Sequence, residues 1–170
     1  RQARLALRLP FPGAMPAGVE VIDVPLVTRR STLTKAQARA RLGLAAGQRL
    51  ALLSFGGFGL EAAPLSHVAN LDGWVLLAED PLVAGNPLLR PLPHAIPYPD
   101  LVNAADAVIT KPGYGIVAEC LANATPIVYT TRGRFAEYPC LVEGIQRYLP
   151  HAFISNDDLY GGRWQAALDA

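Results

Sequence analysis

The chain has 170 residues, of which 51% are hydrophobic and 17% charged, and its net charge is +1. This length is enough for one domain with a hydrophobic core, and the composition excludes a disordered chain. It contains no apolar run of about 18 residues and no leader typical of secretion, so we expect a cytoplasmic protein. Because the chain begins with Arg1, we also expect a fragment or a processed protein.

The charge is unevenly distributed. Residues 1–50 contain nine Arg and Lys against two acidic residues, whereas residues 51–170 contain six against twelve. A basic leader can contact an anionic membrane surface or a nucleic acid, or it can be a solvated connector and helix. Aromatic residues do not interleave with the basic ones, so we expect no nucleic-acid partner, and contact with a membrane surface stays open.

Residues 1–33 are expected to be a connector and the remnant of a preceding domain, with the main domain in residues 34–170. Residues 1–18 contain three prolines and no sustained period, and residues 19–27 favour an extended segment. Thr34 and a glutamine three residues later have the spacing of a capping box, which predicts a helix that ends near Gly43.

Short apolar strands and helices then alternate to the end of the chain. The expected strands are 50–55, 74–79, 95–98, 106–110, 126–130 and 152–155. One helix is expected to begin at Pro99, and three more are expected at 114–124, 136–147 and 157–169. Short strands that are apolar throughout are typical of a parallel sheet covered on both faces. We therefore predict a Rossmann-like three-layer α/β/α domain with a mainly parallel sheet.

In such sheets ligands bind where strands end and helices begin, so the strand-to-helix turns are the candidate site. The first turn, residues 54–59, contains Gly56, Gly57 and Gly59, which permit positive φ and a close approach of the backbone to a ligand. It matches neither the dinucleotide fingerprint nor a Walker motif, so both a phosphate site and a plain tight turn stay open.

The second turn places Lys111 at a strand end, before Gly113 and Gly115. The helix that follows has one apolar face, and Glu119 is expected to project roughly 130° away from its centre. A carboxylate beside a nucleotide site can accept hydrogen bonds from both ribose hydroxyls. Alternatively, Glu119 is a solvated helix residue without a ligand, and Lys111 is a surface charge at the edge of the sheet and does not bind phosphate.

The third turn, residues 130–140, brings Arg132, Arg134, Glu137 and Tyr138 to the same sheet edge. Guanidinium groups suit diphosphate or sugar oxygens, and a salt-bridged structural loop is the alternative.

The two cysteines, Cys120 and Cys140, are expected to be buried thiols. A zinc site would need partners at ligand spacing, and the three histidines are scattered without any. We therefore predict no metal site.

The stretch "YPDLVNAADAVITKPGYGIVAECLANATPIVYTTRGRFAEY" resembles the donor-binding domain of GT-B glycosyltransferases. The type it most resembles is glycosyltransferase family 28, in the C-terminal domain of the transferase that adds N-acetylglucosamine to lipid-linked peptidoglycan precursor. Asp106, "AVIT", Lys111-Pro112-Gly113, Glu119 and Pro126 follow the order of its pattern. "KPGYG" and "RGRFAEY" also resemble bacterial relatives and the N-terminal region of plant arabinose kinases.

The resemblance implies a role for each matched position. It places Gly56, Gly57, Phe58 and Gly59 in the loop facing the donor diphosphate, Ile96 and Tyr98 beside the base, Lys111, Gly113, Tyr114 and Gly115 at the phosphate-side helix start, Glu119 on the ribose, and Arg134, Phe135, Glu137 and Tyr138 near the donor sugar. The last four depart from the Gln-rich motif of the family, so the sugar is not defined.

The resemblance also implies half of a GT-B fold, in which the substrate is a nucleoside diphosphate sugar, such as a UDP sugar, and no metal or other cofactor takes part. The general base and the acceptor site belong to an N-terminal domain that we expect to be missing from this chain, so the chain alone is expected to be inactive. Two alternatives stay open: a non-catalytic module that binds nucleotide sugars, and part of a sugar-nucleotide epimerase.

Overall fold

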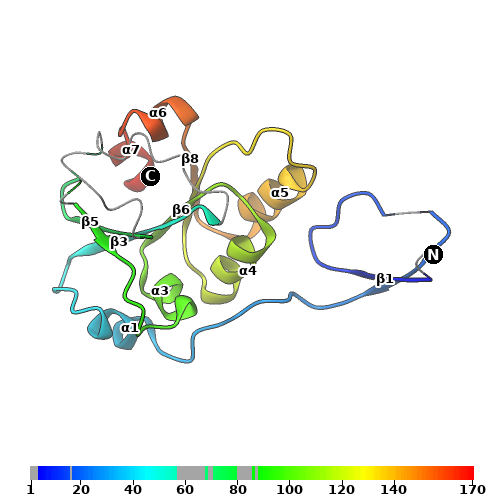
Figure 1. Cartoon of the computed structure of the whole chain (residues 1–170), viewed down its shortest axis with the longest axis horizontal. Coiled ribbons are helices and arrows are strands. Elements are labelled where there is room, and N and C mark those ends of the chain that lie inside the picture. Colours follow the sequence, from blue (N-terminus) through cyan, green and yellow to red (C-terminus); the bar gives the residue numbers. More distant parts are fainter. Residues whose placement is uncertain (1–3, 16, 57–67, 69–70, 80–85, 87) are drawn as a thin grey trace.

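The computed structural model describes residues 4–15, 17–56, 68, 71–79, 86 and 88–170. Its central sheet is six-stranded and parallel, in the order β5-β4-β3-β6-β7-β8 (Figure 1). The strands are β3 (Arg49–Ser54), β4 (Trp74–Ala78), β5 (Leu89–Pro91), β6 (Ala107–Thr110), β7 (Ile127–Tyr129) and β8 (His151–Phe153). The helices are α1 (Lys35–Arg41), α3 (Tyr98–Ala104), α4 (Tyr114–Asn123), α5 (Tyr138–Tyr148), α6 (Asn156–Tyr160) and α7 (Gln165–Leu168).

Two hydrophobic cores, one on each face of the sheet, confirm the three-layer α/β/α prediction. Side chains alternate along β3, so Leu50 and Leu52 face α1, α3, α4 and α5, whereas Ala51 and Leu53 face α6 and α7. All four are buried, as expected for a strand covered on both sides. On the face that α6 and α7 cover, the fully buried Trp164 donates from Nε1 to the carbonyl of Leu159 at 2.7 Å.

The capping box at the start of α1 is confirmed. The amide of Gln37 donates to Oγ1 of Thr34 at 3.3 Å, and Oε1 of Gln37 accepts from the amide of Thr34 at 2.9 Å. Gly43, with φ of 63°, follows the C-cap, which is the left-handed conformation that ends many helices. No helix among the described residues is long and apolar enough to cross a membrane.

The strand predicted at 95–98 is wrong. Residues 94 and 95 form a turn, in which the amide of Ile96 donates to the carbonyl of Pro93 at 3.1 Å, and α3 begins at Tyr98. Proline has no N–H to donate to a strand ladder, which explains why this proline-rich segment leaves the sheet. The edge strand is instead β5, which was not predicted and pairs with β4.

The single helix predicted at 157–169 is also wrong, because glycines divide it. α6 ends at Tyr160, Gly161 is its C-cap, and Gly162 adopts a φ of 72°. α6 begins one residue earlier than predicted, because Ser155 caps it by accepting from the amide of Asp158 at 3.0 Å. α7 is a separate short helix.

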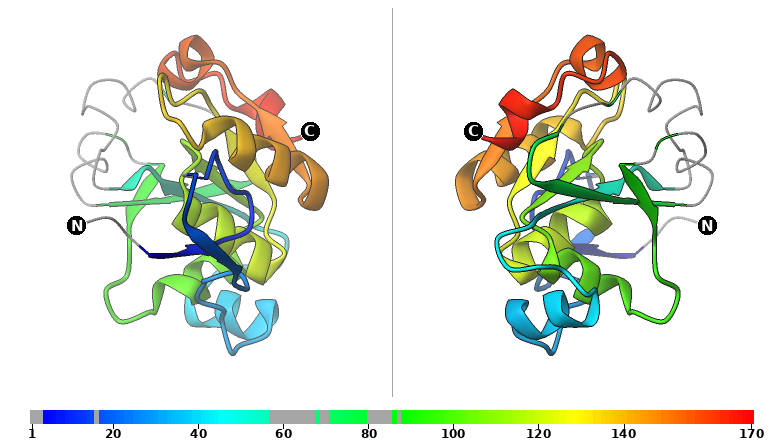
Figure 2. Two further views of the ribbon diagram at one scale, coloured as in Figure 1. Left: turned by 90° about the vertical axis from the view of Figure 1, so that its right-hand side faces the viewer. Right: turned by 90° about the vertical axis from the view of Figure 1, so that its left-hand side faces the viewer.

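The N-terminal segment contains a strand that was not predicted. β1 (Leu5–Arg8) pairs in parallel with β2 (Glu20–Asp23), which lies within the expected extended segment. This two-stranded ribbon extends away from the sheet on the side of α4 and α5 (Figure 1), and it therefore faces the viewer in the left panel of Figure 2. Contact with the domain passes through Phe11, since a Cβ on Gly144 of α5 would lie 2.6 Å from its ring.

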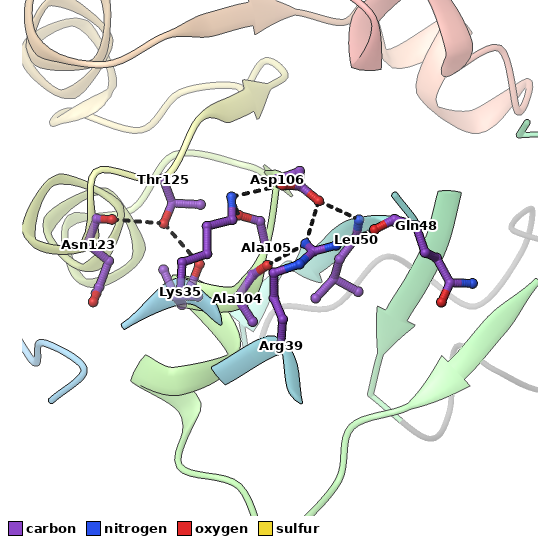
Figure 3. Close-up of polar contacts among 10 residues, drawn as sticks. Lys35, Arg39, Gln48, Leu50, Ala104, Ala105, Asp106, Asn123 and Thr125 are labelled. Carbon is purple, nitrogen blue, oxygen red and sulfur yellow. Dashed lines mark hydrogen bonds and ion pairs between the residues drawn. The ribbon is translucent and has the colours of Figure 1, made fainter. Parts of the chain in front are cut away.

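Asp106 lies just before β6, at the edge where the parallel strands begin, and it links this position to β3 and α1. Its Oδ2 accepts from Nη1 of Arg39 at 2.8 Å and from the amide of Leu50 at 2.9 Å, and Nζ of Lys35 lies 2.8 Å from Oδ1 (Figure 3). Arg39 also donates to the carbonyls of Ala104 and Gln48. Burial alone would raise the pKa of Asp106, but the hydrogen bonds from Lys35, Leu50 and Arg39 outweigh it and lower the pKa.

We expect Asp106→Asn to lower the free energy of unfolding by roughly 2 kcal/mol near neutral pH, because an amide loses the charge-assisted bonds. Since the pKa of Asp106 is lowered by folding, its contribution is present above the ordinary carboxyl pKa of about 3.9 and is lost as pH falls through the folded value. The deficit of the variant should therefore shrink in acid. Urea unfolding over a pH series measures this, with Glu143→Gln on the exposed face of α5 as control. An equal loss in both variants would contradict the role of Asp106.

Candidate functional site

A cavity of about 520 Å³ opens at the carboxyl edge of the sheet. Three strands contribute their ends: Ser54 from β3, Glu79 just after β4, and Thr110 from β6. The remaining lining residues are Arg29, Phe55, Gly56, Tyr98, Lys111, Gly113, Tyr114, Gly115, Ile116, Glu119, Arg132 and Phe135. Its volume is in the range typical of small-molecule sites.

The strand order explains why the cavity lies there. From β3 the chain builds β4 and β5 on one side, and then returns to build β6, β7 and β8 on the other. The segments that leave β3 and β6 therefore diverge, and the crevice between them is the topological switch point at which open α/β sheets bind ligands.

The start of α4 supplies backbone N–H groups to the cavity that have no partner among the described residues. Gly113 is the N-cap and has no side chain to cap the helix, and the first intrahelical bond runs from Val117 to the carbonyl of Gly113 at 3.1 Å. The N–H groups before that bond have no intrahelical partner, and they carry the positive end of the helix dipole. This arrangement suits an anion.

The two glycines at this helix start serve different purposes. A Cβ on Gly113 would lie 2.7 Å from Nη1 of Arg132, which donates to the carbonyl of Pro112 at 2.8 Å. Cζ of Arg132 lies 3.9 Å from the ring centre of Phe135. A Cβ on Gly115 would meet no atom of the described residues within 4 Å. Gly113 therefore makes room for Arg132, whereas Gly115 leaves the cavity open.

Glu119 lies in the cavity wall, but it is not the free carboxylate that the helix pattern suggested. Its exposed fraction is only 5%, and Oε1 lies 2.6 Å from Nε and 2.5 Å from Nη2 of Arg29. The interpretation of Glu119 as a solvated helix residue is therefore wrong. The expected ribose acceptor is already paired with a cation.

Arg29 was missed because it lies 90 residues upstream of its partner, in a segment taken for a connector. Other bonds hold that segment against α3 and α4: Ser31 Oγ donates to Asp100 at 2.6 Å, and the Ser31 amide donates to Asn123 Oδ1 at 3.0 Å. The side chain of Arg29 is 67% exposed and lies 5.9 Å from the ring centre of Tyr98. The excess of basic residues in the first 50 positions was the only available sequence signal.

Tyr98 is the first residue of α3, so it reaches the cavity from a different helix than the residues at the start of α4. Its hydroxyl donates to Oγ of Ser54 at 2.6 Å, and Thr110 donates to the carbonyl of Ser54. Burial raises the pKa of Tyr98 to about 12, so the hydroxyl stays protonated and neutral in the physiological range. These bonds fix the ends of β3 and β6 at the cavity.

A second cavity of about 570 Å³ adjoins the first and shares Lys111, Arg132 and Phe135 with it. Its other lining residues are Thr131, Gly133, Arg134 and Asn156. Arg132 and Arg134 of the third turn therefore reach the same sheet edge as Lys111 of the second turn.

Other predicted site residues lie elsewhere. Ile96 lines a separate apolar cavity with Leu42 and Leu44, away from Tyr98. Glu137 is the exposed N-cap of α5 and Tyr138 its first residue, and neither lines the two adjoining cavities. Gly57, Phe58 and Gly59 lie outside the described residues.

Cys120 and Cys140 are both free, the first buried and the second half-buried. Burial raises the pKa of the Cys120 thiol, which keeps it protonated and unreactive. Among the described residues, no three His, Cys, Asp or Glu side chains gather as metal ligands would.

Comparison with known proteins gives one curated relative and several structures. No family model matches the chain. An L-arabinokinase of Arabidopsis thaliana is 32% identical over 169 residues, which is 96% of this chain but 16% of that protein. The glycosyltransferase of kitacinnamycin and the calicheamicin glycosyltransferase CalG4 match 74% of this chain, with TM-scores of 0.54 and 0.56 and identities of 21% and 20%. SnogD, a glycosyltransferase from Streptomyces nogalater, matches 96% with a TM-score of 0.51 and 16% identity.

These similarities show the fold: the chain has a Rossmann-like domain of the kind found in GT-B glycosyltransferases. The chain covers 35%, 34% and 52% of the three enzymes. The match to an arabinokinase agrees with the resemblance of "KPGYG" and "RGRFAEY" to plant arabinose kinases.

We expect Arg29→Ala and Glu119→Gln each to lower the free energy of unfolding by roughly 1–2 kcal/mol, because each leaves a partner unpaired. This loss is smaller than that expected for a fully buried ion pair, because solvent screens the exposed Arg29. The double variant should lose little more than the larger single loss, with a coupling energy of about 1 kcal/mol. Urea unfolding measures all three, and Arg30→Ala is the matched control. Additive losses would show that the contact does not hold residues 24–33 on the domain.

Proposed function

We propose that this chain is the nucleotide-sugar-binding domain of a glycosyltransferase that moves a hexosyl-type group from a nucleoside diphosphate sugar to an acceptor. The observation that carries the proposal is the cavity at the switch point. It combines an uncapped helix start with a buried carboxylate one turn further along the same helix. Phosphate and ribose are adjacent in a nucleotide, as these two features are adjacent on α4.

The diphosphate is proposed to lie at the start of α4. The free N–H groups there favour negative charge, and Gly115 permits close approach because nothing else occupies the space a Cβ would take. Lys111 and Arg132 border the same place and add two positive charges. In transfer, the same groups stabilise the charge that develops on the departing nucleoside diphosphate.

The ribose is proposed to bind Glu119, in competition with Arg29. Both contacts of Arg29 are made to Oε1, and its exposed side chain can move into solvent without disturbing the core. Hydroxyl groups that donate to a carboxylate form charge-assisted bonds, which compensate for the lost ion pair. Tyr98, beside Arg29, then borders the base.

The acceptor and the general base are proposed to come from outside the described residues. The described residues that line the cavity include no histidine and two carboxylates: Glu119, which is paired, and Glu79, just after β4. Because the chain spans about a third of the first two matched enzymes, we propose binding by this chain and turnover by a longer protein.

A second candidate is a non-catalytic module that binds nucleotide sugars beside another enzyme. The match to an arabinokinase favours it, because 96% of this chain aligns to 16% of a protein whose name describes a kinase. Both candidates require binding, and only the transferase requires the longer protein to consume a nucleotide sugar. Release of nucleoside diphosphate by the longer protein separates them.

Calorimetric titration with UDP, GDP, ADP and dTDP tests the proposal, and at least one should bind. For that base, the ribonucleotide should bind about tenfold more tightly than its 2′-deoxy form, because one charge-assisted hydrogen bond is worth about 1.5 kcal/mol. This difference should disappear in Glu119→Ala. The control Glu143→Ala, on the exposed face of α5, should keep it.

Failure of all four nucleotides to bind would contradict the proposed function. Binding with equal affinity in the wild type and Glu119→Ala would remove Glu119 from the site while leaving the cavity as the nucleotide site.

Gly115→Ala should separate folding from binding. Alanine is the better helix former, and its Cβ meets no neighbour, so the free energy of unfolding should stay the same or rise by about 0.5 kcal/mol. Nucleotide affinity should fall several-fold, because the methyl group enters the space proposed for the diphosphate. Calorimetry and urea unfolding on the same preparation measure both. Unchanged affinity would mean that the phosphates do not lie at the start of α4.

A further inference from the structure

The second cavity has an unusual charge. Among the described residues, Lys111, Arg132 and Arg134 line it, and no acidic side chain does. The first cavity, in contrast, has both Glu79 and Glu119 in its wall. Positive charge is therefore concentrated at one end of the joined cavities, on the side of β7 and β8.

This charge is not neutralised within the described part of the chain. In that part, seven other arginine and lysine side chains face carboxylates, in the pairs Arg8–Asp23, Arg29–Glu119, Lys35–Asp106, Arg39–Asp106, Arg41–Asp100, Arg49–Asp169 and Arg163–Asp158. The three cations of the second cavity have no such pair among the described residues. Lys111 donates to the neutral hydroxyl of Tyr160 at 3.1 Å, and Arg132 donates to a backbone carbonyl.

Two of these three side chains are held in place by contacts. Cζ of Arg132 lies 3.9 Å from the ring centre of Phe135 and its Nη1 donates to the carbonyl of Pro112, and Nζ of Lys111 lies 5.7 Å from the ring centre of Tyr160. Asn156 is fixed by hydrogen bonds of 2.8 Å to Thr130 and Thr131. A cavity lined by positive charge that no described carboxylate pairs with favours a ligand group of negative charge.

We propose that the second cavity binds an acidic group on the transferred sugar, so that the donor is a nucleoside diphosphate uronic acid. The inference rests on the proposed function, which places the diphosphate at the start of α4, between the two cavities. In that position the two phosphates contact the first N–H groups of α4, and Lys111 and Arg132 lie beside them. Arg134 lines only the second cavity, beyond them, and its guanidinium suits a carboxylate in a bidentate pair.

The experiment compares neutral and acidic donors that differ in one group. UDP, UDP-glucose, UDP-galactose, UDP-glucuronate and UDP-galacturonate are titrated into the wild type, Arg134→Gln and the control Arg30→Gln. Glucose 1-phosphate and glucuronic acid 1-phosphate, followed by NMR, make the same comparison without a base. Circular dichroism checks that each variant is folded.

In the wild type, one uronate donor should bind about tenfold more tightly than its neutral parent, as one charged hydrogen-bonded contact predicts. Salt should reduce this preference. Arg134→Gln should bring the two affinities together without changing the affinity for UDP, and Arg30→Gln should change neither.

Equal binding of acidic and neutral donors by the wild type would overturn the inference and leave the proposed function intact. So would an Arg134→Gln variant that loses as much affinity for UDP as for UDP-glucuronate, because Arg134 would then bind the diphosphate. Binding of no nucleotide and no sugar phosphate would contradict the proposed function itself, and this inference with it.

Discussion

The carboxylate of Asp106 is the contact on which the architecture most depends. It stands just before β6 and joins two parts of the chain that are distant from it in sequence, the helix α1 and the first residues of β3. Arg39 of α1 also donates to the carbonyl of Ala104 at the end of α3. β3 and β6 are the pair between which the strand order reverses. Fixing their amino ends sets their register, and the register in turn brings Ser54 level with Thr110 at the opposite edge.

From that edge, the geometry of the cavity follows from backbone chemistry more than from any one side chain. Thr110 and Tyr98 both bond to Ser54, so the two strand ends and α3 are joined just below the opening. Pro112 and Gly113 then turn the chain into α4 with its first N–H groups free, and Arg132 fills the space that a larger residue at 113 would occupy. The result is a site that presents backbone donors and guanidinium groups on the same side.

Local signals in the sequence were sufficient for the layers, for most strands and for the Thr34 capping box, because burial on two faces and capping leave direct marks on composition. They failed at two places where proline or glycine determines the backbone conformation. At 95–98 the apolar pattern fits a strand that the prolines prevent, and at Gly161–Gly162 the helix pattern continues across glycines that end the helix. The placement of Lys111 and Gly115 at a sheet edge followed from strand order. The partner of Glu119 did not, because nothing in the helix pattern indicates a contact with a residue so far upstream as Arg29.

In the proposed binding mode, the Arg29–Glu119 pair makes the segment before α1 part of the binding equilibrium. If ligand and Arg29 compete for one oxygen, the observed affinity is the intrinsic affinity multiplied by the fraction of molecules in which Arg29 has left. That fraction depends on how firmly Ser31 and its neighbours hold the segment to α3 and α4, and so on residues that never touch the ligand. Natural variation in residues 24–33 can therefore adjust the working concentration range of the site while the cavity itself stays unchanged.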